Sequence, residues 1–376
     1  MSDSESEEEI ADLSNPDVIT KYIEASKVVQ GALQKVLEAT KPDVDVAELC
    51  KIGDEYITEE TKKLFSKKVK GKTIERGIAF PTCISRNNLC GHVSPLDGES
   101  HKLEAGDIVK VDMAAHFDGF IAGAAHTIVL ADEEVTDKRA DVVTAAYKAA
   151  EAVARCISVG QTNTSCTDII AQVAAEYGVE PVQGVLSHQV KRHVIDGNQT
   201  IMNKETAEER VAEFEFGLNE VYCVDIMMST GSGKAKETEM RTTVFKRAVE
   251  NSYMLKTQRS RQFLSDVHAR FPTLCFSMRA FEDPQVARVG VSECVRHELL
   301  HEYPVLKDKE GEFVAQMKFT VLLLPSGSKK ITGLALSQGN VKSTKEIKNE
   351  AVLEVLRRSM AAKKKKKKSK GESKEE

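Results

Sequence analysis

The order of the apolar patterns along the chain limits its fold more than any other feature. Apolar residues recur with helical spacing in four segments, at 15–39, 45–65, 138–157 and 165–177. Strand-like runs are found at 77–86, 107–117, 120–130, 219–228 and 240–248. Helices and strands therefore come in blocks and do not alternate one by one. This order predicts an α+β fold in which the sheet is not assembled from regular βαβ units.

The last third of the chain changes pattern twice. Helical spacing returns after residue 249, where we expect three helices, at 257–269, 282–289 and 292–301. Strands are expected again at 303–307 and 312–324, and a last amphipathic helix at 346–360. We therefore predict one domain from residues 15–248 and 303–345, a helical insert at 249–302, and a C-terminal helix.

The two ends of the chain carry opposite charge. Residues 1–12 contain six acidic side chains and no base, whereas residues 357–376 contain ten Lys or Arg against three Glu. We expect residues 1–14 and 361–376 to be disordered, because charged low-complexity segments bury too little apolar surface to fold. The body between them is mildly acidic.

The lysine-rich end indicates a polyanionic partner. Its lysines are Lys363, Lys364, Lys365, Lys366, Lys367, Lys368 and Lys370. Such a run can neutralise phosphates without reading base identity. A solubilising role and a nuclear-targeting role are alternative explanations, and neither conflicts with nucleic-acid binding.

Composition excludes several classes of protein. No stretch approaches 18 uncharged apolar residues, so we expect no membrane-spanning helix and no membrane partner. The acidic N-terminal segment lacks the apolar core of a secretory signal. The eight cysteines form no C-x-x-C pair, and we expect them to be reduced thiols of a cytosolic or nuclear protein.

Four segments resemble the active-site strands of type 2 methionine aminopeptidases. They read KVDMAAHFDGFIAG from Lys110, LSHQVKRH from Leu186, NEVYCVDIMMSTGSGK from Asn219 and AQMKFTVLLLP from Ala315. In that family two aspartates, a histidine and two glutamates hold a pair of divalent metals. The corresponding positions here are Asp112, Gly123, His188, Asp225 and Lys318, and a histidine of the substrate pocket corresponds to His92.

Two of these five positions cannot hold a metal as the family does. Gly123 has no side chain, and Lys318 places an ammonium where a bridging carboxylate is needed. An ammonium about 4 Å from a divalent ion is repelled by roughly 8 kcal/mol at an effective dielectric of about 20. We therefore expect no metal, no other cofactor and no catalysis, and expect Lys318 to pair with Asp112 or Asp225. Residual metallo-aminopeptidase activity is the alternative.

The chain as a whole resembles the proliferation-associated, ErbB-receptor-binding protein group, whose yeast relatives are curved-DNA-binding proteins. The segments that carry this resemblance include GIAFPTCISRNN from Gly77, LSHQVKRHVIDG from Leu186 and MRAFED from Met278. The resemblance implies a pita-bread (creatinase/aminopeptidase-like) fold with a type 2 helical insert and disordered charged termini. It also implies a non-catalytic protein that binds RNA and the large ribosomal subunit near the tunnel exit.

The same resemblance implies a location in the cytoplasm and the nucleus or nucleolus, with roles in ribosome biogenesis, translation and growth regulation. The alternative function is that of a DNA-binding transcription regulator, whose partners would be DNA and other transcription regulators. Lysine-driven affinity does not distinguish RNA from DNA.

Three further groups of basic residues are candidates for nucleic-acid contacts. They are Lys67, Lys68, Lys70 and Lys72 in KKLFSKKVKGK, Lys234 and Lys236 in TGSGKAK, and Arg259, Arg261 and Arg270 in the insert. A lysine run of this kind is more often a solvated helix end. TGSGK is not a phosphate loop of the GxxxxGK[ST] type, because Met228 and Ala235 stand where that motif needs Gly and Ser or Thr.

Overall fold

A nine-stranded antiparallel sheet forms the centre of the molecule. The computed structural model describes residues 11–67, 71, 73–336 and 339–362. The strand order is β1-β3-β4-β14-β8-β6-β7, with β15 beside β14 and β5 beside β8. The strands are β1 (Arg76–Arg86), β3 (Ile108–Phe117), β4 (Phe120–Val129), β5 (Glu180–Pro181), β6 (Leu186–Gln189), β7 (Thr200–Met202), β8 (Val221–Ser229), β14 (Val314–Leu324) and β15 (Gly327–Lys330). The predicted α+β class is confirmed.

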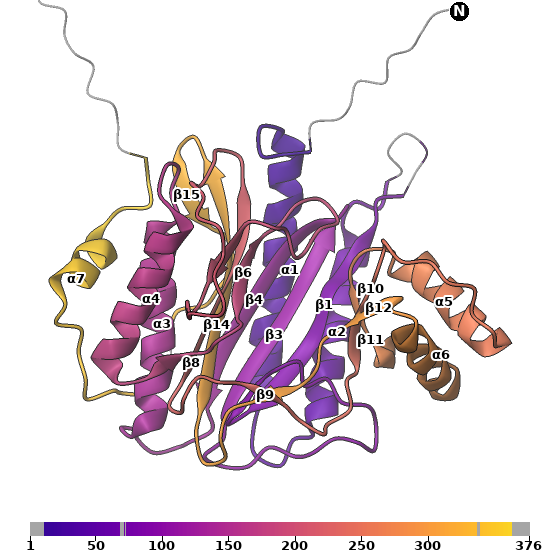
Figure 1. Ribbon diagram of the computed structural model, residues 1–376, viewed down its shortest axis with the longest axis horizontal. Helices are drawn as coiled ribbons and strands as arrows, with labels where there is room; N and C mark the ends of the chain where they lie inside the picture. Colours follow the sequence, from indigo (N-terminus) through magenta and orange to yellow (C-terminus); the bar gives the residue numbers. More distant parts are fainter. Residues whose placement is uncertain (1–10, 68–70, 72, 337–338, 363–376) are drawn as a thin grey trace, which may run out of the picture.

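Two pairs of helices cover one face of this sheet. α1 (Pro16–Ala39) and α2 (Val46–Lys63) pack against β1, β3 and β4. α3 (Lys138–Cys156) packs against β8 and β14, and α4 (Asn163–Tyr177) packs on α3. Figure 1 shows these helices behind and beside the sheet, so that its other face is free of helices. These four helices begin and end within a few residues of the predicted bounds.

Side-chain caps explain where the first two helices begin. Asn15 Oδ1 accepts a hydrogen bond from Asp17 N at 3.0 Å, and Pro16 occupies the first helical position. Asp45 Oδ1 accepts from Ala47 N at 2.8 Å in the same way. Asn15 is therefore the cap of the first helix.

β3 and β4 form a hairpin that turns at Asp118 and Gly119, both of which have positive φ (55° and 77°).

The insert differs from the prediction of three helices. It contains two, α5 (Gln258–Arg270) and α6 (Pro284–Arg296), which pack on each other. α6 runs without a break through Gly290, where an added Cβ would lie 2.3 Å from Phe263 Cγ. The close approach of α5 and α6 therefore needs a glycine at this position, which we had expected to lie between two helices. The chain leaves the helix at Glu298, which has a positive φ of 55°.

The insert also contains strands that the sequence did not predict. β10 (Val244–Arg247) pairs with β11 (Cys275–Ser277) on one side and β12 (Leu300–Glu302) on the other. A 3₁₀ turn at Met278–Ala280 follows β11. Residues 249–302 are therefore not wholly helical, and their sheet continues into residues that we assigned to the main domain.

A second small sheet joins segments that are far apart in the sequence. Its order is β2 (Leu89–Gly91), β13 (Leu306–Lys307) and β9 (Lys236–Glu237). The strand predicted at 303–307 is thus limited to two residues. Strands of two or three residues are too short to show an alternating apolar pattern in the sequence, and they form only by pairing with their neighbours.

Residues of the predicted N-terminal tail contribute to the core, and the last helix is shorter than predicted. Leu13, which we placed in the acidic tail, is 3% exposed and packs with the apolar side chains under α1 and α2. α7 (Glu350–Arg357) is capped by Asn349 and buries Val352 and Val355 against α3 and α4. Of the predicted tails at 1–14 and 361–376, residues 1–10 and 363–376 lie outside the described residues. Among the helices that are described, none has the length and apolar character to cross a membrane.

Candidate functional site

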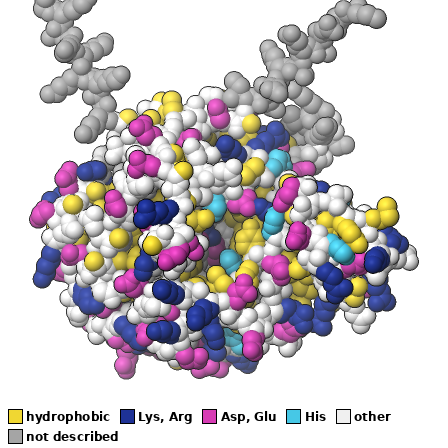
Figure 2. Space-filling model, viewed as in Figure 1, with side chains coloured by type: hydrophobic (Ala, Val, Ile, Leu, Met, Phe, Trp, Pro, Cys, Tyr) yellow, Lys and Arg dark blue, Asp and Glu magenta, His cyan; other side chains and the backbone are white. Residues whose placement is uncertain are grey.

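A cavity of 890 Å³ lies on the helix-free face of the central sheet. Figure 2 shows it as a hollow near the middle of this face, with hydrophobic side chains inside. Its lining includes all six residues that the sequence placed in a former active site: His92, Asp112, Gly123, His188, Asp225 and Lys318. Strands from distant parts of the chain bring them together, because β3, β4, β14 and β8 are neighbours in the sheet.

Lys318 forms ion pairs with both aspartates of the cavity floor. Its Nζ lies 2.5 Å from Asp112 Oδ2 and 3.1 Å from Asp225 Oδ2. Strand register explains the contact: Lys318 on β14 lies opposite Asp225 on β8 and opposite Ala125 on β4, and Ala125 lies opposite Asp112 on β3. The prediction that Lys318 pairs with one of these aspartates is confirmed, and it pairs with both.

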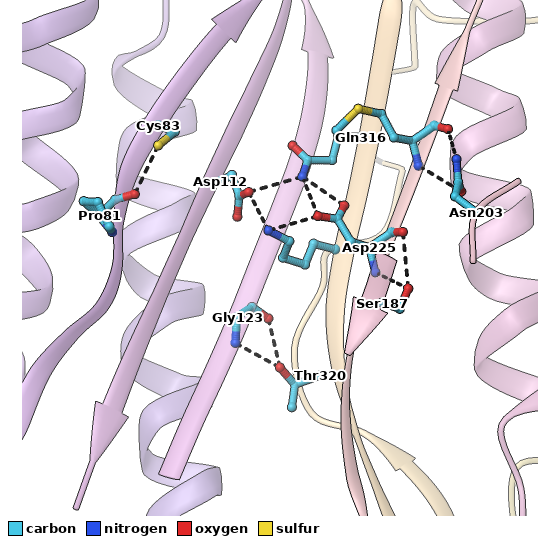
Figure 3. A network of polar contacts seen from close by, with 11 residues as sticks. Pro81, Cys83, Asp112, Gly123, Ser187, Asn203, Asp225, Gln316 and Thr320 are labelled. Carbon is cyan, nitrogen blue, oxygen red and sulfur yellow. Dashed lines mark hydrogen bonds and ion pairs between the residues drawn. The ribbon is translucent and has the colours of Figure 1, made fainter. Parts of the chain in front are cut away.

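Gln316 is a member of this cluster that the sequence analysis missed. Its Nε2 donates to Asp112 Oδ2 at 3.2 Å and to Asp225 Oδ1 and Oδ2 at 2.9 and 3.0 Å. Figure 3 shows this amide close to the two carboxylates. Residues two apart on a strand share a face, so the spacing from Lys318 could have pointed to it. Two donors from one strand thus hold two carboxylates from two others.

The charges of this cluster depend on one another. Burial by itself lowers the pKa of Lys318, but the Asp112 and Asp225 carboxylates reverse this and raise it well above its ordinary range. Burial is also the main reason that the pKa of Asp225 is raised, and the Lys318 ammonium opposes that rise. The lysine is therefore an ammonium at neutral pH, and its charge is what makes the buried carboxylates tolerable.

The surroundings of Gly123 leave no room for a side chain. A Cβ at this position would lie 2.8 Å from Cys223 Sγ. The backbone of Gly123 is also fully engaged: its N–H donates to Thr320 Oγ1 at 2.9 Å, and its carbonyl accepts from Thr320 and from Thr332 Oγ1. Figure 3 shows the two contacts with Thr320. A carboxylate at position 123 would require Cys223 to move.

The two histidines of the cavity bond to backbone carbonyls. Nδ1 of His92 lies 2.9 Å from Pro304 O, and Nδ1 of His188 lies 3.1 Å from Gly197 O. His92 also contacts the rings of Phe80 and Tyr303. Burial lowers the pKa of His92, so this imidazole is neutral at pH 7.

The lysines of the TGSGKAK loop lie at the edge of the cavity. Lys234 lines it, and both Lys234 and Lys236 are exposed. The loop itself is closed around a carboxylate, because Asp308 accepts from Ser229 Oγ at 2.7 Å and from Gly233 N at 2.9 Å. These donors are already occupied, which agrees with rejecting a phosphate-loop assignment.

The arginines of the insert differ in their availability. Arg259 is exposed on α5. Arg261 donates to the carbonyls of Leu255 and Lys256 at 3.0 and 2.8 Å. Arg270 donates to Ala280 O and its guanidinium lies over the rings of Phe271 and Phe281. The last two therefore have a structural role beside any contact with a ligand.

The remaining basic candidates are only partly placed. Lys67 is exposed beyond the end of α2. Lys68, Lys70 and Lys72 lie outside the described residues, as do all seven lysines between 363 and 370. The structure brings the predicted former active site into one place, whereas the basic candidates that it describes lie on separate elements.

Comparisons with known proteins agree with this architecture. The family described as metallopeptidase family M24 matches residues 20–224. The protein named ErbB-3 binding protein 1 from Solanum tuberosum is 48% identical over 351 residues, which cover 93% of this chain and 89% of that protein. The curved DNA-binding protein of Schizosaccharomyces pombe is 38% identical over 368 residues, covering 96% and 95% of the two chains.

A solved structure shares the whole fold. The structure of a thermophilic Arx1 has a TM-score of 0.85 and 26% sequence identity, and the match covers 93% of this chain and 100% of that chain. The curved sheet with its two helix pairs is the expected pita-bread fold. The chain therefore belongs to metallopeptidase family M24, and among its members it groups with the ErbB-3-binding, proliferation-associated and curved-DNA-binding proteins.

Proposed function

We propose that this protein is a non-catalytic member of its family that binds RNA and associates with the large ribosomal subunit near the tunnel exit. The observation that carries the non-catalytic part is the ammonium of Lys318, which lies between the carboxylates of Asp112 and Asp225. In this reading the former active site is a structural ion cluster.

The side chains of the cavity do not fit the pair of divalent metals that the family implies. Metal hydrolysis needs ions that are held and bridged by carboxylates. Here the two carboxylates are already neutralised in part by Lys318, and position 123 offers no ligand while Cys223 fills the adjacent space. An ion at this place would face a repulsion of roughly 8 kcal/mol from the ammonium at about 4 Å and an effective dielectric of about 20.

A peptidase assay tests the non-catalytic part. We expect no turnover of a Met-Ala-Ser peptide by the purified chain with manganese or cobalt present. A metal-dependent turnover that is lost in His188→Ala would establish the alternative, residual aminopeptidase activity.

The nucleic-acid part rests on the family resemblance and on the basic side chains. Lys67, Lys234, Lys236 and Arg259 are exposed, and the lysine-rich end adds at least six further positive charges. If about six phosphates are neutralised, the log–log dependence of the binding constant on salt should have a slope near −5 on duplex-like nucleic acid.

Cosedimentation with purified large ribosomal subunits tests the ribosomal part. We expect the intact protein to travel with the subunits at low salt, and a chain with Lys363–Lys368 replaced by Ala to be released at lower salt. Replacing six lysines that are exposed elsewhere on the body is the matched control, namely Lys27, Lys35, Lys41, Lys62, Lys102 and Lys329. Failure of the intact protein to cosediment would remove this proposal.

Binding to DNA is the second candidate, and the similarity to the curved DNA-binding protein of fission yeast favours it. Competition between curved duplex DNA and ribosomal RNA at physiological salt separates the two. A preference for RNA supports a role in ribosome biogenesis and translation, with a location in the cytoplasm and nucleolus. A preference for DNA supports transcription regulation in the nucleus.

A further inference from the structure

The cavity has a form that suits an elongated, partly apolar ligand. Its volume of 890 Å³ falls within the range of small-molecule sites, about 300–1,000 Å³. Much of the wall is apolar and includes Phe80, Ile121, Ile195, Met227, Tyr303 and Leu306. These residues come from five separate parts of the chain, so the wall belongs to the tertiary structure. Burying a methylene chain against such a wall is favourable by about 0.8 kcal/mol per CH₂.

The floor of the cavity carries an unbalanced negative charge. Asp112 and Asp225 supply two carboxylates and Lys318 supplies one ammonium, while the buried His92 is neutral at pH 7. The side chains of Asp112, Asp225 and Lys318 remain 11%, 16% and 15% exposed. A small monocation reaching the floor meets half the repulsion from the Lys318 ammonium that a divalent ion would meet and is attracted by two carboxylates, so it would complete the neutralisation of this cluster.

Hydrogen-bond donors are also scarce at the floor. Oδ1 of Asp112 and Oε1 of Gln316 are buried and accept no hydrogen bond within the described part of the chain. Because these two atoms are enclosed, a ligand in the cavity reaches only the exposed parts of the Asp112 and Asp225 carboxylates. A primary ammonium has three N–H donors for those carboxylate oxygens.

The mouth of the cavity is acidic as well. Glu208 and Glu209 line it, are exposed, and form no ion pair within the described residues. Of the other charged groups at the rim, Asp196 pairs with Lys246, and Lys204 pairs with Glu180 at 2.6 Å. Among the described residues that line the rim, Lys234 is the one cation without an ion pair. A second acidic centre therefore lies at the entrance, separated from the floor by the apolar wall.

We propose that this cavity binds an aliphatic diamine or polyamine. One primary ammonium contacts the carboxylates of Asp112 and Asp225 at the floor, the methylene chain lies along the apolar wall, and a second ammonium lies between Glu208 and Glu209. This site is separate from the basic surfaces invoked for nucleic acid. Its failure would leave the ribosomal proposal unchanged, because the two use different residues and opposite charges.

Calorimetric titration of the full chain with 1,6-diaminohexane, in EDTA to exclude metals, tests the proposal. We expect saturable binding, with hexane-1,6-diol as a neutral probe that does not bind. The variant Glu208→Gln/Glu209→Gln should weaken diamine binding about tenfold, since two exposed ion pairs are worth up to about 1 kcal/mol each. It should leave the binding of hexylamine, which has one charge, unchanged.

Matched variants keep the result interpretable. Glu133→Gln/Glu134→Gln removes two neighbouring exposed carboxylates outside the cavity and should bind the diamine normally. Asp225→Asn should weaken both amines, provided that its circular dichroism spectrum shows a folded chain. The proposal is overturned if the diol binds as well as the diamine, or if neither the Glu208/Glu209 nor the Asp225 substitution changes the affinity.

A peptide arm identifies the source of the ammonium. A Met-Ala-Ser amide with a free amino terminus also carries an ammonium beside an apolar chain, and its N-acetylated form does not. If the free peptide binds more tightly than the diamine and acetylation abolishes that binding, the ligand is a chain terminus and the diamine assignment is wrong. Weaker binding of the peptide supports the diamine.

Discussion

At the scale of single residues, the site depends on one lysine and on the space around one glycine. Lys318 holds two buried carboxylates, and Gly123 leaves room for Cys223. The family resemblance pointed to both positions, because each corresponds to a metal-binding carboxylate in the type 2 methionine aminopeptidases. They did not reveal Gln316, since its role depends on which strands are neighbours. Nor did they show that Cys223 occupies the space beside Gly123.

Substituting Lys318→Met should destabilise the protein by about 3–5 kcal/mol, because it leaves two buried carboxylates without their cation. Urea unfolding at pH 7.5 measures this difference. The loss should be smaller at pH 5, because burial raises the pKa of Asp225 and its carboxyl takes up a proton more easily there. Lys329→Met, at an exposed position on β15, is the control. A loss below about 1 kcal/mol for Lys318→Met would contradict the role assigned to the ammonium.

Gly123→Ala should destabilise the fold by about 1–3 kcal/mol, the usual cost of overpacking a buried position. The added methyl would lie 2.8 Å from Cys223 Sγ. Cys223→Ala should remove most of that cost when the two changes are combined, which a double-mutant cycle of unfolding free energies would measure. Additive effects would show that the thiol is not what excludes a side chain here.

At the scale of the elements, one buried arginine links the insert to the body. Arg279 follows β11, and its side chain is 8% exposed. It donates to Asp54 Oδ2 on α2 and to Ser94 Oγ, both at 2.6 Å. The sequence predicted helices here from their periodicity and missed β11 and β12, because three-residue strands acquire their pairing only from β10. It also missed that Gly290 permits one continuous helix.

Arg279→Ala should loosen the insert more than the rest of the molecule. Loss of a buried charged contact leaves Asp54 partly unpaired and removes the link between α2 and the 3₁₀ turn. Hydrogen exchange should therefore become faster in α5 and α6, with little change in α3 and α4. Arg288→Ala on α6, which removes a more exposed ion pair with Glu99, is the control. Equal acceleration in all helices would mean that the arginine stabilises the whole fold instead.

At the scale of the whole molecule, buried titratable groups couple stability to pH. Lys110 on β3 is 1% exposed and donates to the carbonyls of Asn87 and Val314, both at 2.9 Å. Burial lowers its pKa from 10.5 to about 7. Between these two values the unfolded chain holds a proton that the folded chain releases. Stability contributed by this group therefore rises with pH from about 7 to about 10.5.

Lys110→Met should remove this part of the pH dependence. The slope of the parent protein minus that of Lys110→Met should approach about 1.4 kcal/mol per pH unit for one proton, because the buried thiols with raised pKa values contribute equally to both proteins. Urea unfolding at several pH values between 7 and 10 measures it. Lys318 does not interfere in this window, because its pKa is raised and its contribution is lost only at higher pH. An unchanged slope in Lys110→Met would show that other groups are responsible.

The sequence alone determined the local features of this protein. The caps at Asn15 and Asp45, the hairpin at Asp118 and Gly119, and the main helices follow from hydrogen bonds and periodicities that span a few residues. Tertiary structure decided the rest: the ion cluster of Lys318, Gln316, Asp112 and Asp225, the three-stranded sheet of the insert, and the continuity of α6. These depend on the register and approach of segments up to about two hundred residues apart, for which local patterns carry no signal.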